Sequence, residues 1–387
     1  MTTSLMKFSL LLLGLPFICT ACAQQKATTY VHPFPTSRDP LKWPFSSHSI
    51  WNMPIGDSAI FVHAGLEPVD AEGLSVDEDI IVLTPDAPMM DIYLNNASWT
   101  KELNRCVPED SILYSVPCPD DFVYSYNNWE QLTPNAGLAS LMPDGRTIKQ
   151  TQPFARCEPN LPGTSKFLFP DQDIYGEGMI GAHGGSNLSA IGGTIRLGEL
   201  MPNSGPIRHA LKMNIYAAEN VKYDEKNKGF RWPAIKSDGY AAELYGKKRT
   251  TPFVDGLLIG SLLALPHWIN LDSLNFETEP GRVLAETFQN YGAYLVDDTY
   301  RDSWSVMTAW EPEGRWVDAF EKAWGFSFIT VKDDSPWARD IEKIYFNLYL
   351  IVNNGPNSIG GGGNRHQPLA PEISIVTQFS NNKNKQR

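Results

Sequence analysis

The sequence has 387 residues with 44 acidic and 32 basic side chains, which gives a formal net charge of -12. This charge argues against nucleic acid and anionic membranes as partners, because both attract a basic surface. A hydrophobic fraction of 42% is ample for a core, and the length fits one large domain or two smaller ones. The composition therefore favours a globular enzyme or binding protein, in which a local group of Lys and Arg could still hold an acidic glycan.

The first 23 residues have the pattern of an export signal. Lys7 supplies the positive charge, and residues 8–18 form an apolar run that is too short to span a bilayer. Cys22 stands where a lipobox places its lipidated residue, although its small neighbours also fit cleavage by ordinary signal peptidase. We expect a lipoprotein ahead of a freely secreted protein. The mature chain would then work outside the cytoplasm of a bacterium, either lipid-anchored in the outer membrane or periplasmic or secreted, with a lipid on Cys22 as its membrane contact.

Three cysteines, Cys106, Cys118 and Cys157, lie outside this signal. In an oxidising compartment a pair of them should be bridged. The short spacing predicts a Cys106–Cys118 disulfide, with Cys157 either left free or exchanged into the bridge.

The rest of the chain divides by composition. Residues 24–42 are rich in Pro, Thr and Lys and show no apolar period, which predicts a tether. We expect a single globular domain over 43–356, followed by a loop and C-terminal tail over 357–387. From 43 to about 170, short apolar runs such as DIIVL, MMDIYL and FVYSY alternate with Pro, Asp, Asn and Gly, which is the pattern of strands and turns.

Helical signals appear in the last third of the chain. The apolar spacing over 280–291 predicts a helix, and the AYLV run that follows it predicts a strand. A shorter helix is expected over 318–324. Ser335 is an N-cap before Pro336, and the apolar period from there predicts a helix that ends at the Asn-Asn-Gly-Pro turn of 353–356.

These signals together predict a β-rich (α+β) fold. Its core would resemble a β-sandwich, with helices packed on its C-terminal half. The apolar run over 251–265 is interrupted by two glycines and predicts either a buried strand pair or a buried helix.

Reactive side chains are concentrated between residues 178 and 240. The glycines of GAHGGSNLSAIGGTI would let main-chain N–H groups approach a ligand, and His183 stands at the entrance of this run. A nucleotide-binding loop would need a Lys and a Ser or Thr that are missing here. His183 is therefore either a site residue or a structural histidine of a turn.

Residues 207–216, IRHALKMNIY, alternate with period two and predict a strand. Lys212 and Asn214 would share one face, which is typical of the concave surface of a polysaccharide-cleaving β-sandwich. His209 falls on the apolar face at the start of the strand. It is either a residue of a pocket or a hydrogen-bonded core histidine.

Carboxylates near this strand suggest acid–base chemistry. Asp238 lies two residues before Tyr240, and Glu199 is the nearest other carboxylate in the sequence. Paired carboxylates can act as acid and base on a glycosidic bond. A histidine or tyrosine base would instead serve β-elimination if Arg or Lys neutralised a uronate. Glu199 can alternatively cap a helix or pair with Arg196.

Several motifs in this order resemble a broad group of secreted bacterial proteins with no established activity. They are SIWNMPI, GGTIRLGEL, GPIRHALKMNI, WPAIKSDGY and VLAETFQNYGAYLVDD followed by Trp304, and they span roughly residues 43–325. The resemblance implies one continuous domain. It also implies recurring polar or aromatic positions at Trp51, Asn52, Arg196, Glu199, His209 and Asp238.

We therefore expect an extracytoplasmic carbohydrate-active enzyme that cleaves a polysaccharide or oligosaccharide without a cofactor or metal, by lyase chemistry slightly ahead of glycoside hydrolysis. The alternative is a non-catalytic glycan-binding surface lipoprotein. We expect the charged members of the site to converge on one cleft, with a histidine and a tyrosine at its rim. The catalytic candidates are His209, Asp238, Glu199 and Tyr240, and the substrate-binding candidates are His183, Arg196, Lys212, Trp51, Asn52 and Trp232.

Overall fold

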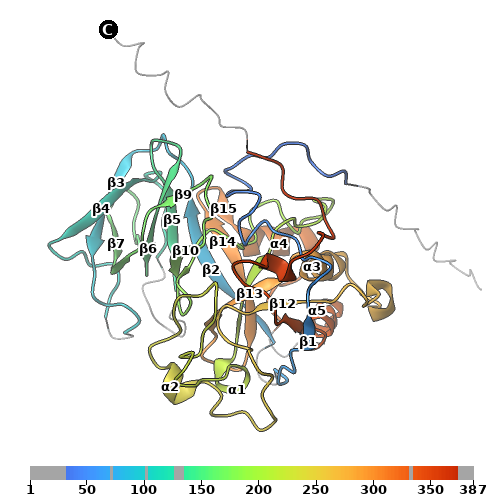
Figure 1. Cartoon of the computed structure of the whole chain (residues 1–387). Coiled ribbons are helices and arrows are strands. Elements are labelled where there is room, and N and C mark those ends of the chain that lie inside the picture. The colour runs from blue at the N-terminus through green and yellow to red at the C-terminus, as the bar shows by residue number, and fades with distance from the viewer. Residues whose placement is uncertain (1–31, 70–72, 101–102, 126–134, 331–333, 374–387) are drawn as a thin grey trace, which may run out of the picture. The chain divides into compact units, whose positions relative to one another are not determined.

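The computed structural model describes residues 32–373 apart from 70–72, 101–102, 126–134 and 331–333. The described residues form one compact unit (Figure 1). Within the described residues, no helix has the length and apolar character needed to cross a membrane. The expected export signal lies outside the described residues.

One large mixed sheet and one small sheet make up most of the regular structure. The large sheet has the spatial order β1 (Phe61–His63), β16 (Tyr349–Ile351), β12 (Leu262–Ala264), β13 (Ala293–Asp298), β11 (Leu211–Ile215), β14 (Trp304–Glu311), β2 (Leu74–Val82), β5 (Leu138–Leu141), β6 (Thr147–Gln152) and β8 (Phe167–Leu168). Two short strands extend it, β15 (Gly314–Arg315) beside β14 and β9 (Gln172–Asp173) beside β6. The small sheet has the order β4 (Ile112–Pro117), β3 (Met89–Leu94) and β7 (Gly163–Ser165).

The remaining elements are short connections and the helices. They are β10 (Ile180–His183), α1 (Ala217–Asn220), α2 (Ala241–Leu244), α3 (Glu279–Asn290), α4 (Trp316–Trp324), α5 (Pro336–Phe346), and two 3₁₀ turns at Leu271–Leu274 and Ile359–Gly361. The strand-rich composition of the structure confirms the β-rich class.

Strand directions at the centre of the large sheet decide which residues can meet. β11 runs parallel to β13 and antiparallel to β14, and β2 runs parallel to β14. Asp298 at the end of β13 therefore lies beside Ile215 at the end of β11, which in turn pairs with Trp304 at the start of β14. We call this side of the sheet the carboxyl edge. The amino edge is the opposite side, where His209 precedes β11 and β14 ends at Glu311.

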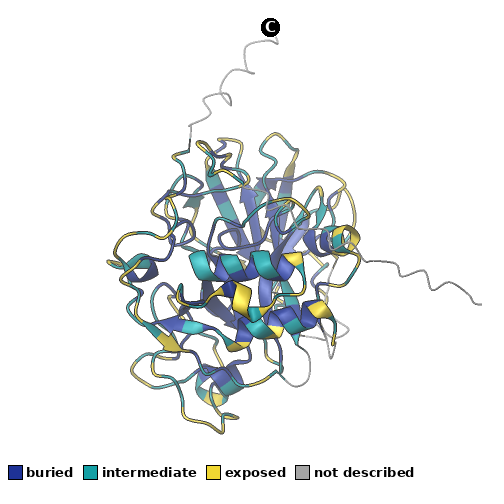
Figure 2. Ribbon diagram, turned by 90° about the vertical axis from the view of Figure 1, so that its right-hand side faces the viewer, coloured by how far each residue is buried: buried dark blue, intermediate teal, exposed yellow. Residues whose placement is uncertain are grey.

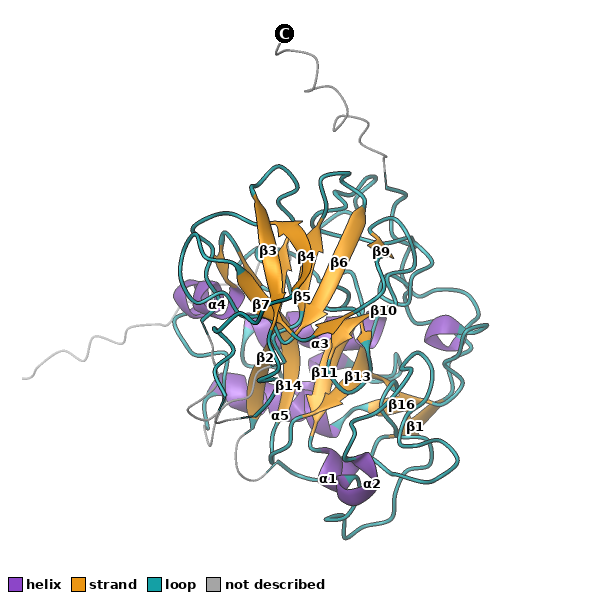
Figure 3. Ribbon diagram, turned by 90° about the vertical axis from the view of Figure 1, so that its left-hand side faces the viewer, coloured by secondary structure: helices purple, strands orange, loops and turns teal. Residues whose placement is uncertain are grey.

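The two faces of the central strands have different chemistry because side chains alternate along a strand. Met213 on β11 belongs to an apolar cluster that also holds Phe288 of α3, Phe320 of α4 and Trp337 of α5. The helices accordingly cover this face, and they lie behind the strands in Figure 3 and in front of them in Figure 2. Lys212 points to the other face. The period-two alternation expected for this strand is therefore present over Leu211–Ile215.

The polar face of β11 is covered rather than exposed. All five residues of β11 are buried, and the Lys212 Nζ donates a hydrogen bond of 2.6 Å to the carbonyl of Ser189 in the glycine-rich segment. A Cβ added to Gly193 would lie 2.9 Å from Cγ of Lys212, and Gly193 has a φ of 75°. This glycine therefore lets the segment lie flat on the strand, and the expected open concave surface is not formed here.

The helices expected in the last third are present. α3 begins after Thr278, whose hydroxyl accepts a hydrogen bond of 3.1 Å from the N–H of Gly281. α5 begins after Ser335, whose hydroxyl accepts from the N–H of Ala338 at 3.1 Å, but it ends at Phe346 and not at the Asn-Asn-Gly-Pro turn. The chain turns there into β16, which pairs with β12 and β1 in the sheet.

The strand predictions are correct only for some runs. DIIVL and MMDIYL fall in β2 and β3, whereas FVYSY contributes only the bridge between Tyr124 and Arg156. The apolar run over 251–265 contains one three-residue strand, β12, and otherwise irregular backbone. The small sheet packs its Ile92 and Val116 against Ile80 of β2.

The expected Cys106–Cys118 disulfide is wrong. Cys106 is bonded to Cys157, and their Cα atoms are 5.7 Å apart. Cys118 follows β4, is buried in the apolar cluster of the small sheet, and accepts a hydrogen bond from Arg156 at 3.5 Å. Burial raises the pKa of its thiol to about 11. Short sequence spacing did not predict the pair because the strand before Cys118 directs this side chain into the core.

The described parts of the expected tether and tail lie against the domain. The Arg38 guanidinium donates hydrogen bonds to the carbonyls of Pro371 at 2.5 Å and Trp43 at 3.1 Å. The Arg365 guanidinium donates to the carbonyl of Pro54 at 3.1 Å. Residues 32–42 and 357–373 therefore belong to the packed structure.

Candidate functional site

The structure divides the predicted site residues into two groups at opposite ends of β11. Arg196, Glu199 and His209 lie together at the amino edge, whereas Asp238 lies with Asp297 near the carboxyl edge. Asn214 pairs in register with Asp297 and is five residues from His209, a separation of about 16 Å along an extended strand. The expected convergence of these residues on one cleft is therefore not formed.

The three predicted charged residues at the amino edge are all paired. Arg196 Nε lies 2.6 Å from Glu311 Oε1, and its backbone N–H donates to Glu199 Oε2 at 2.8 Å. His209 Nε2 lies 3.2 Å from both carboxylate oxygens of Glu199, and Nδ1 lies 2.9 Å from the carbonyl of Ala210. Burial disfavours the imidazolium, but the charge of Glu199 and the hydrogen bonds to Glu199 and Ala210 together outweigh it and raise the pKa of His209. These contacts form a closed pairing network.

The aromatic and amide residues at the amino edge are also structural. Trp51 is buried and its Nε1 donates to the carbonyl of Gly178 at 2.7 Å. Asn52 Oδ1 accepts from Trp43 Nε1 at 2.8 Å. The hollow between these residues, Arg196 and the other neighbours has a volume of about 20 Å³, which is room for about one water molecule. A sugar ring does not fit there.

Lys212 belongs to a buried network on the polar face of the sheet. Its Nζ lies 2.7 Å from Asp79 Oδ2, and both side chains are almost fully buried. Thr194 Oγ1 donates to the same carboxylate at 2.6 Å, and His183 Nδ1 lies 3.3 Å from its other oxygen. Burial lowers the pKa of Lys212. Burial alone would raise the pKa of Asp79, but Lys212 and His183 outweigh it and lower that pKa.

One ring nitrogen of His183 is left over in this network. The side chain is 1% exposed, and Nε2 has no hydrogen-bond partner among the residues that the structure describes. The two residues that follow it, Gly184 and Gly185, lie against the carboxylate of Asp297 so closely that no side chain would fit at either position. His183 therefore stands at the boundary between the Lys212 network and the carboxyl groups beyond it.

A cluster of carboxyl groups lies toward the carboxyl edge of the sheet. β13 supplies Asp297 and Asp298, β2 supplies Asp77, and the loop before α2 supplies Asp238. A register shift in the pairing of β13 with β11 sets Asp297 opposite Asn214. We call these four aspartates the carboxyl cluster.

Amide groups rather than cations hold the carboxyl cluster. Asn135 Nδ2 donates to Asp297 Oδ2 at 2.7 Å and to Asp77 Oδ2 at 3.0 Å. Asn214 Nδ2 lies 3.4 Å from the same oxygen of Asp77, and the buried Asn214 Oδ1 finds no partner within the described part of the chain. No lysine or arginine forms an ion pair with Asp238, Asp297 or Asp298 among the residues that the structure describes.

The environment of the cluster favours protonated carboxyl groups. Burial, followed by the charges of Asp238 and Asp77, raises the pKa of Asp297 well above its usual range. Burial also raises the pKa of Asp238, which is hydrogen-bonded to Asp297 and to the hydroxyl of Tyr245. Burial raises the pKa of Asp298 to about 6. Asp238 and Asp297 therefore form a carboxyl pair that keeps a proton more readily than an ordinary aspartate.

Two phenols border the carboxyl cluster. Tyr245 is 2% exposed, whereas Tyr240 is 37% exposed and its hydroxyl lies 3.4 Å from Asp298 Oδ2. Burial and the neighbouring Asp238 charge raise the pKa of both tyrosines. Both phenols therefore stay protonated and act as hydrogen-bond donors. Trp232, expected to bind substrate, is half-buried and packs against an apolar cluster that includes Ile81 of β2 and Tyr294 of β13.

Asp77, Asp79, Asp297 and Asp298 were not among the predicted site residues. A usable signal was present in each case, because SVDEDIIV places three acidic residues in a strand run, two of them on one face, and LVDD places two at the end of a run. Acidic residues inside apolar strand runs are costly unless they are paired or functional. The VLAETFQNYGAYLVDD motif was recognised as a whole, but its final aspartates were not singled out.

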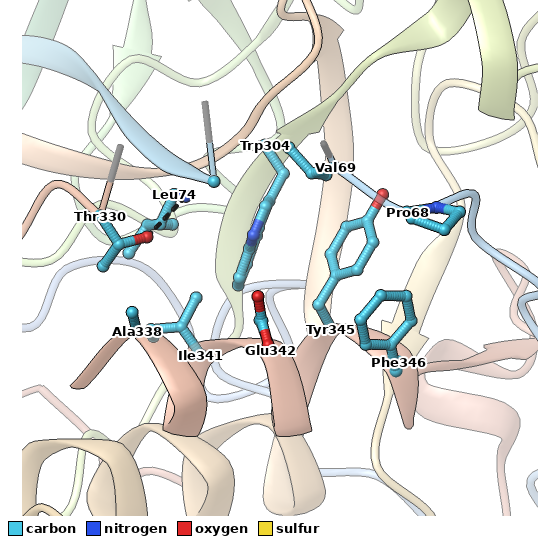
Figure 4. Close-up of a pocket in the computed structure, with 11 residues that line it drawn as sticks. Pro68, Val69, Leu74, Trp304, Thr330, Ala338, Ile341, Glu342, Tyr345 and Phe346 are labelled. Carbon is cyan, nitrogen blue, oxygen red and sulfur yellow. Dashed lines mark hydrogen bonds between the residues drawn. The ribbon is translucent and has the colours of Figure 1, made fainter. Parts of the chain in front are cut away.

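A separate cavity of about 300 Å³ lies near the start of β2 and β14. Trp304, Ile341 and Tyr345 line it, and Glu342 contributes a carboxyl group to its described lining (Figure 4).

Comparison with known proteins adds no assignment, because no protein-family model, curated protein or solved structure matches the chain. Among the residues that the structure describes, no group of three or more His, Cys, Asp or Glu side chains is arranged to hold a metal ion.

Proposed function

We propose that this protein is an extracytoplasmic carbohydrate-active enzyme that cleaves a polysaccharide by glycoside hydrolysis at the carboxyl cluster. The observation that carries the proposal is the carboxyl pair Asp238–Asp297, which retains a proton beside a third carboxyl group, Asp298, that ionises at about pH 6. Two carboxyl groups of different pKa are what acid–base cleavage of a glycosidic bond requires.

Asp238 is the proton donor in this proposal. It is partly exposed, so a leaving-group oxygen can reach it, whereas Asp297 is 3% exposed. The hydrogen bond from Asp297 and the hydroxyl of Tyr245 hold the Asp238 carboxyl group in one orientation. The raised pKa values of the pair keep a proton bound nearer to neutral pH, and Asp297 can pass it through their hydrogen bond to Asp238, which delivers it to the leaving group.

Asp298 is the second carboxyl group. With a pKa of about 6 it is largely ionised at neutral pH and can accept a proton from a water molecule. Its Oδ1 accepts a hydrogen bond of 2.8 Å from the N–H of Ala217, which fixes the side chain. The hydroxyl of Tyr240 faces its other oxygen and would order a substrate hydroxyl beside it.

The positions of the cations favour hydrolysis over the elimination that the sequence slightly favoured. A lyase needs a cation to neutralise a uronate, but Arg196 is paired with Glu311, and Lys212 is buried against Asp79. A lyase also needs a base such as a phenolate, and the pKa of Tyr240 is raised. The carboxyl cluster offers protons and carboxylates instead.

The test is product release by the purified full-length protein from a panel of acidic and neutral polysaccharides. We expect new reducing ends without the ultraviolet absorbance of an unsaturated uronate, and a loss of about 10²- to 10⁴-fold in rate for Asp238→Asn. His209→Gln at the amino edge is the matched control and should keep the wild-type rate. An unsaturated product, or a His209→Gln variant as inactive as Asp238→Asn, would contradict the proposal.

A non-catalytic glycan-binding surface lipoprotein is the second candidate. The exposed Tyr240 next to a carboxyl cluster favours sugar binding in either case. Saturable binding without any product over the whole panel would support this alternative. Both proposals include lipidation of Cys22 and a location in the outer membrane or periplasm. Both also include a sandwich-like arrangement of the small sheet against β2, with helices on the C-terminal half.

A further inference from the structure

A second exposed tyrosine stands beside the carboxyl cluster. Tyr300 is 70% exposed, and its ring lies 5.6 Å from that of Tyr240 at an interplanar angle of 72°. Tyr240 in turn places its hydroxyl 3.4 Å from Asp298. An aromatic surface therefore continues from the carboxyl groups outward into solvent.

The backbone of Tyr300 adopts a strained conformation. Its φ is 57°, in the left-handed region that bulky residues rarely adopt. Of the exposed aromatic residues that the structure describes, Tyr300 alone has a positive φ. Such strain costs free energy and is retained mainly where a residue must be presented in one orientation.

The turn that carries Tyr300 is fastened at several points. Thr299 donates its N–H to the carbonyl of Ile215 at 3.2 Å, and its hydroxyl lies 2.7 Å from the carbonyl of Arg301 and 3.1 Å from that of Ser303. Asp298 accepts hydrogen bonds from the N–H groups of Ala217 and Tyr300. The same carboxylate thus fixes both the proposed catalytic position and the turn beside it.

We propose that Tyr300, together with Tyr240, is a sugar-binding subsite that stacks a pyranose ring next to the carboxyl cluster. This inference rests on the proposed function. The tyrosine ring offers an apolar face to the C–H groups of a sugar and a hydroxyl to its polar groups. Because the turn is already fixed before binding, little conformational entropy is lost when the ring takes up a sugar.

The experiment measures binding of the same polysaccharide panel to Asp238→Asn protein, which is intended to bind without cleaving. Adding Tyr300→Ala should weaken binding by about tenfold, the loss expected for about 1.4 kcal/mol from one stacked ring. Tyr300→Phe should keep the binding, because it keeps the ring. Trp268→Ala is the matched control, since Trp268 is 65% exposed but lies against Phe61 and Tyr349 at the β1 end of the sheet.

A third variant separates binding from folding. Tyr300→Gly removes the ring and relieves the positive φ, so its melting temperature should be no lower than that of the parent while its binding falls as for Tyr300→Ala. If Asp238→Asn binds a polysaccharide and Tyr300→Ala binds it equally well, the subsite is wrong and the proposed function stands. If Asp238→Asn binds no member of the panel, the proposed function and the subsite both fail.

Discussion

Asp79 and Asp297 are buried carboxyl groups on the same face of one sheet, and their environments shift their pKa values in opposite directions. Asp79 lies 2.7 Å from Lys212 Nζ and accepts a hydrogen bond from Thr194 at 2.6 Å, so its pKa is lowered despite burial. Asp297 is held by Asn135 at 2.7 Å and lies beside Asp238, so its pKa is raised well above the usual range. The main difference between the two sites is the cation Lys212, which forms an ion pair with Asp79.

This difference separates a structural carboxylate from a reactive one. A buried ion pair with satisfied hydrogen bonds, such as Asp79 with Lys212, holds the glycine-rich segment on the sheet. Buried carboxyl groups that face one another have no such compensation, and strongly perturbed pKa values of this kind cluster at functional sites. The following changes test whether the two sites differ as described.

The largest change in stability is expected at the ion pair of Asp79 with Lys212. Asp79→Asn removes the charge that compensates buried Lys212, so it should lower the free energy of unfolding by about 3–5 kcal/mol. Chemical denaturation measures this loss. Asp79→Asn combined with Lys212→Met removes both charges and should recover much of it. A single variant as stable as the wild type would show that the pair does not hold the fold.

A pH dependence is expected from Asp298. Its pKa is raised from 3.8 to about 6 in the folded state, so the protonated form is the one that folding favours. Its contribution is therefore fully present below about pH 4 and is lost as the pH rises through about 6, a change of about 3 kcal/mol for a shift of this size. The difference in unfolding free energy between wild type and Asp298→Asn should fall over this range. A flat difference would contradict the raised pKa.

Removing the Asp297 carboxyl group should change the free energy of unfolding in the direction opposite to Asp79→Asn. Asp297→Asn relieves the repulsion with Asp238 and Asp77, so we expect a gain of about 1–3 kcal/mol in unfolding free energy at neutral pH. Thermal and urea denaturation of the two proteins measure it. Polysaccharide cleavage should fall at the same time, as expected where activity depends on a destabilised group. A loss of stability as large as that of Asp79→Asn would place Asp297 among the structural carboxylates.

The smallest effect is expected at the amino edge. His209→Gln keeps a hydrogen-bonding side chain toward Glu199, so it should cost about 1 kcal/mol or less. The raised pKa of His209 means that this cost is largest below the ordinary histidine pKa and declines as the pH rises through the folded value. Unfolding measured at acidic and alkaline pH tests this sign. A cost that grows with pH would contradict it.

Local sequence signals predicted the helices and the central strand. The apolar spacing over 280–291 predicted α3, the Ser335 cap predicted the start of α5, and the alternation in IRHALKMNIY placed Lys212 and Asn214 on one face of β11. Periodicity could not show that this face is covered by the glycine-rich segment, because that contact joins residues from different parts of the chain.

The candidate site was less predictable because it depends on strand order. Glu199 and Asp238 are near one another in the sequence, but the length of β11 separates them in the structure. Asp77 and Asp297 are far apart in the sequence, yet Asn135 donates hydrogen bonds to both. Only Asp238 and Tyr240 of the catalytic candidates lie at the carboxyl cluster. The missing information was the parallel pairing of β11 with β13 and of β2 with β14.

The most direct test of the central claim is a carboxyl ¹³C NMR titration that resolves Asp79, Asp238 and Asp297 in the full-length protein, with each assignment made by its Asn variant. The account predicts that Asp79 titrates below the ordinary aspartate value of about 3.9, and that the Asp238–Asp297 pair titrates above it. If the pair instead titrates at or below that value, it holds no proton for catalysis, and the carboxyl cluster would not be the active site that we propose.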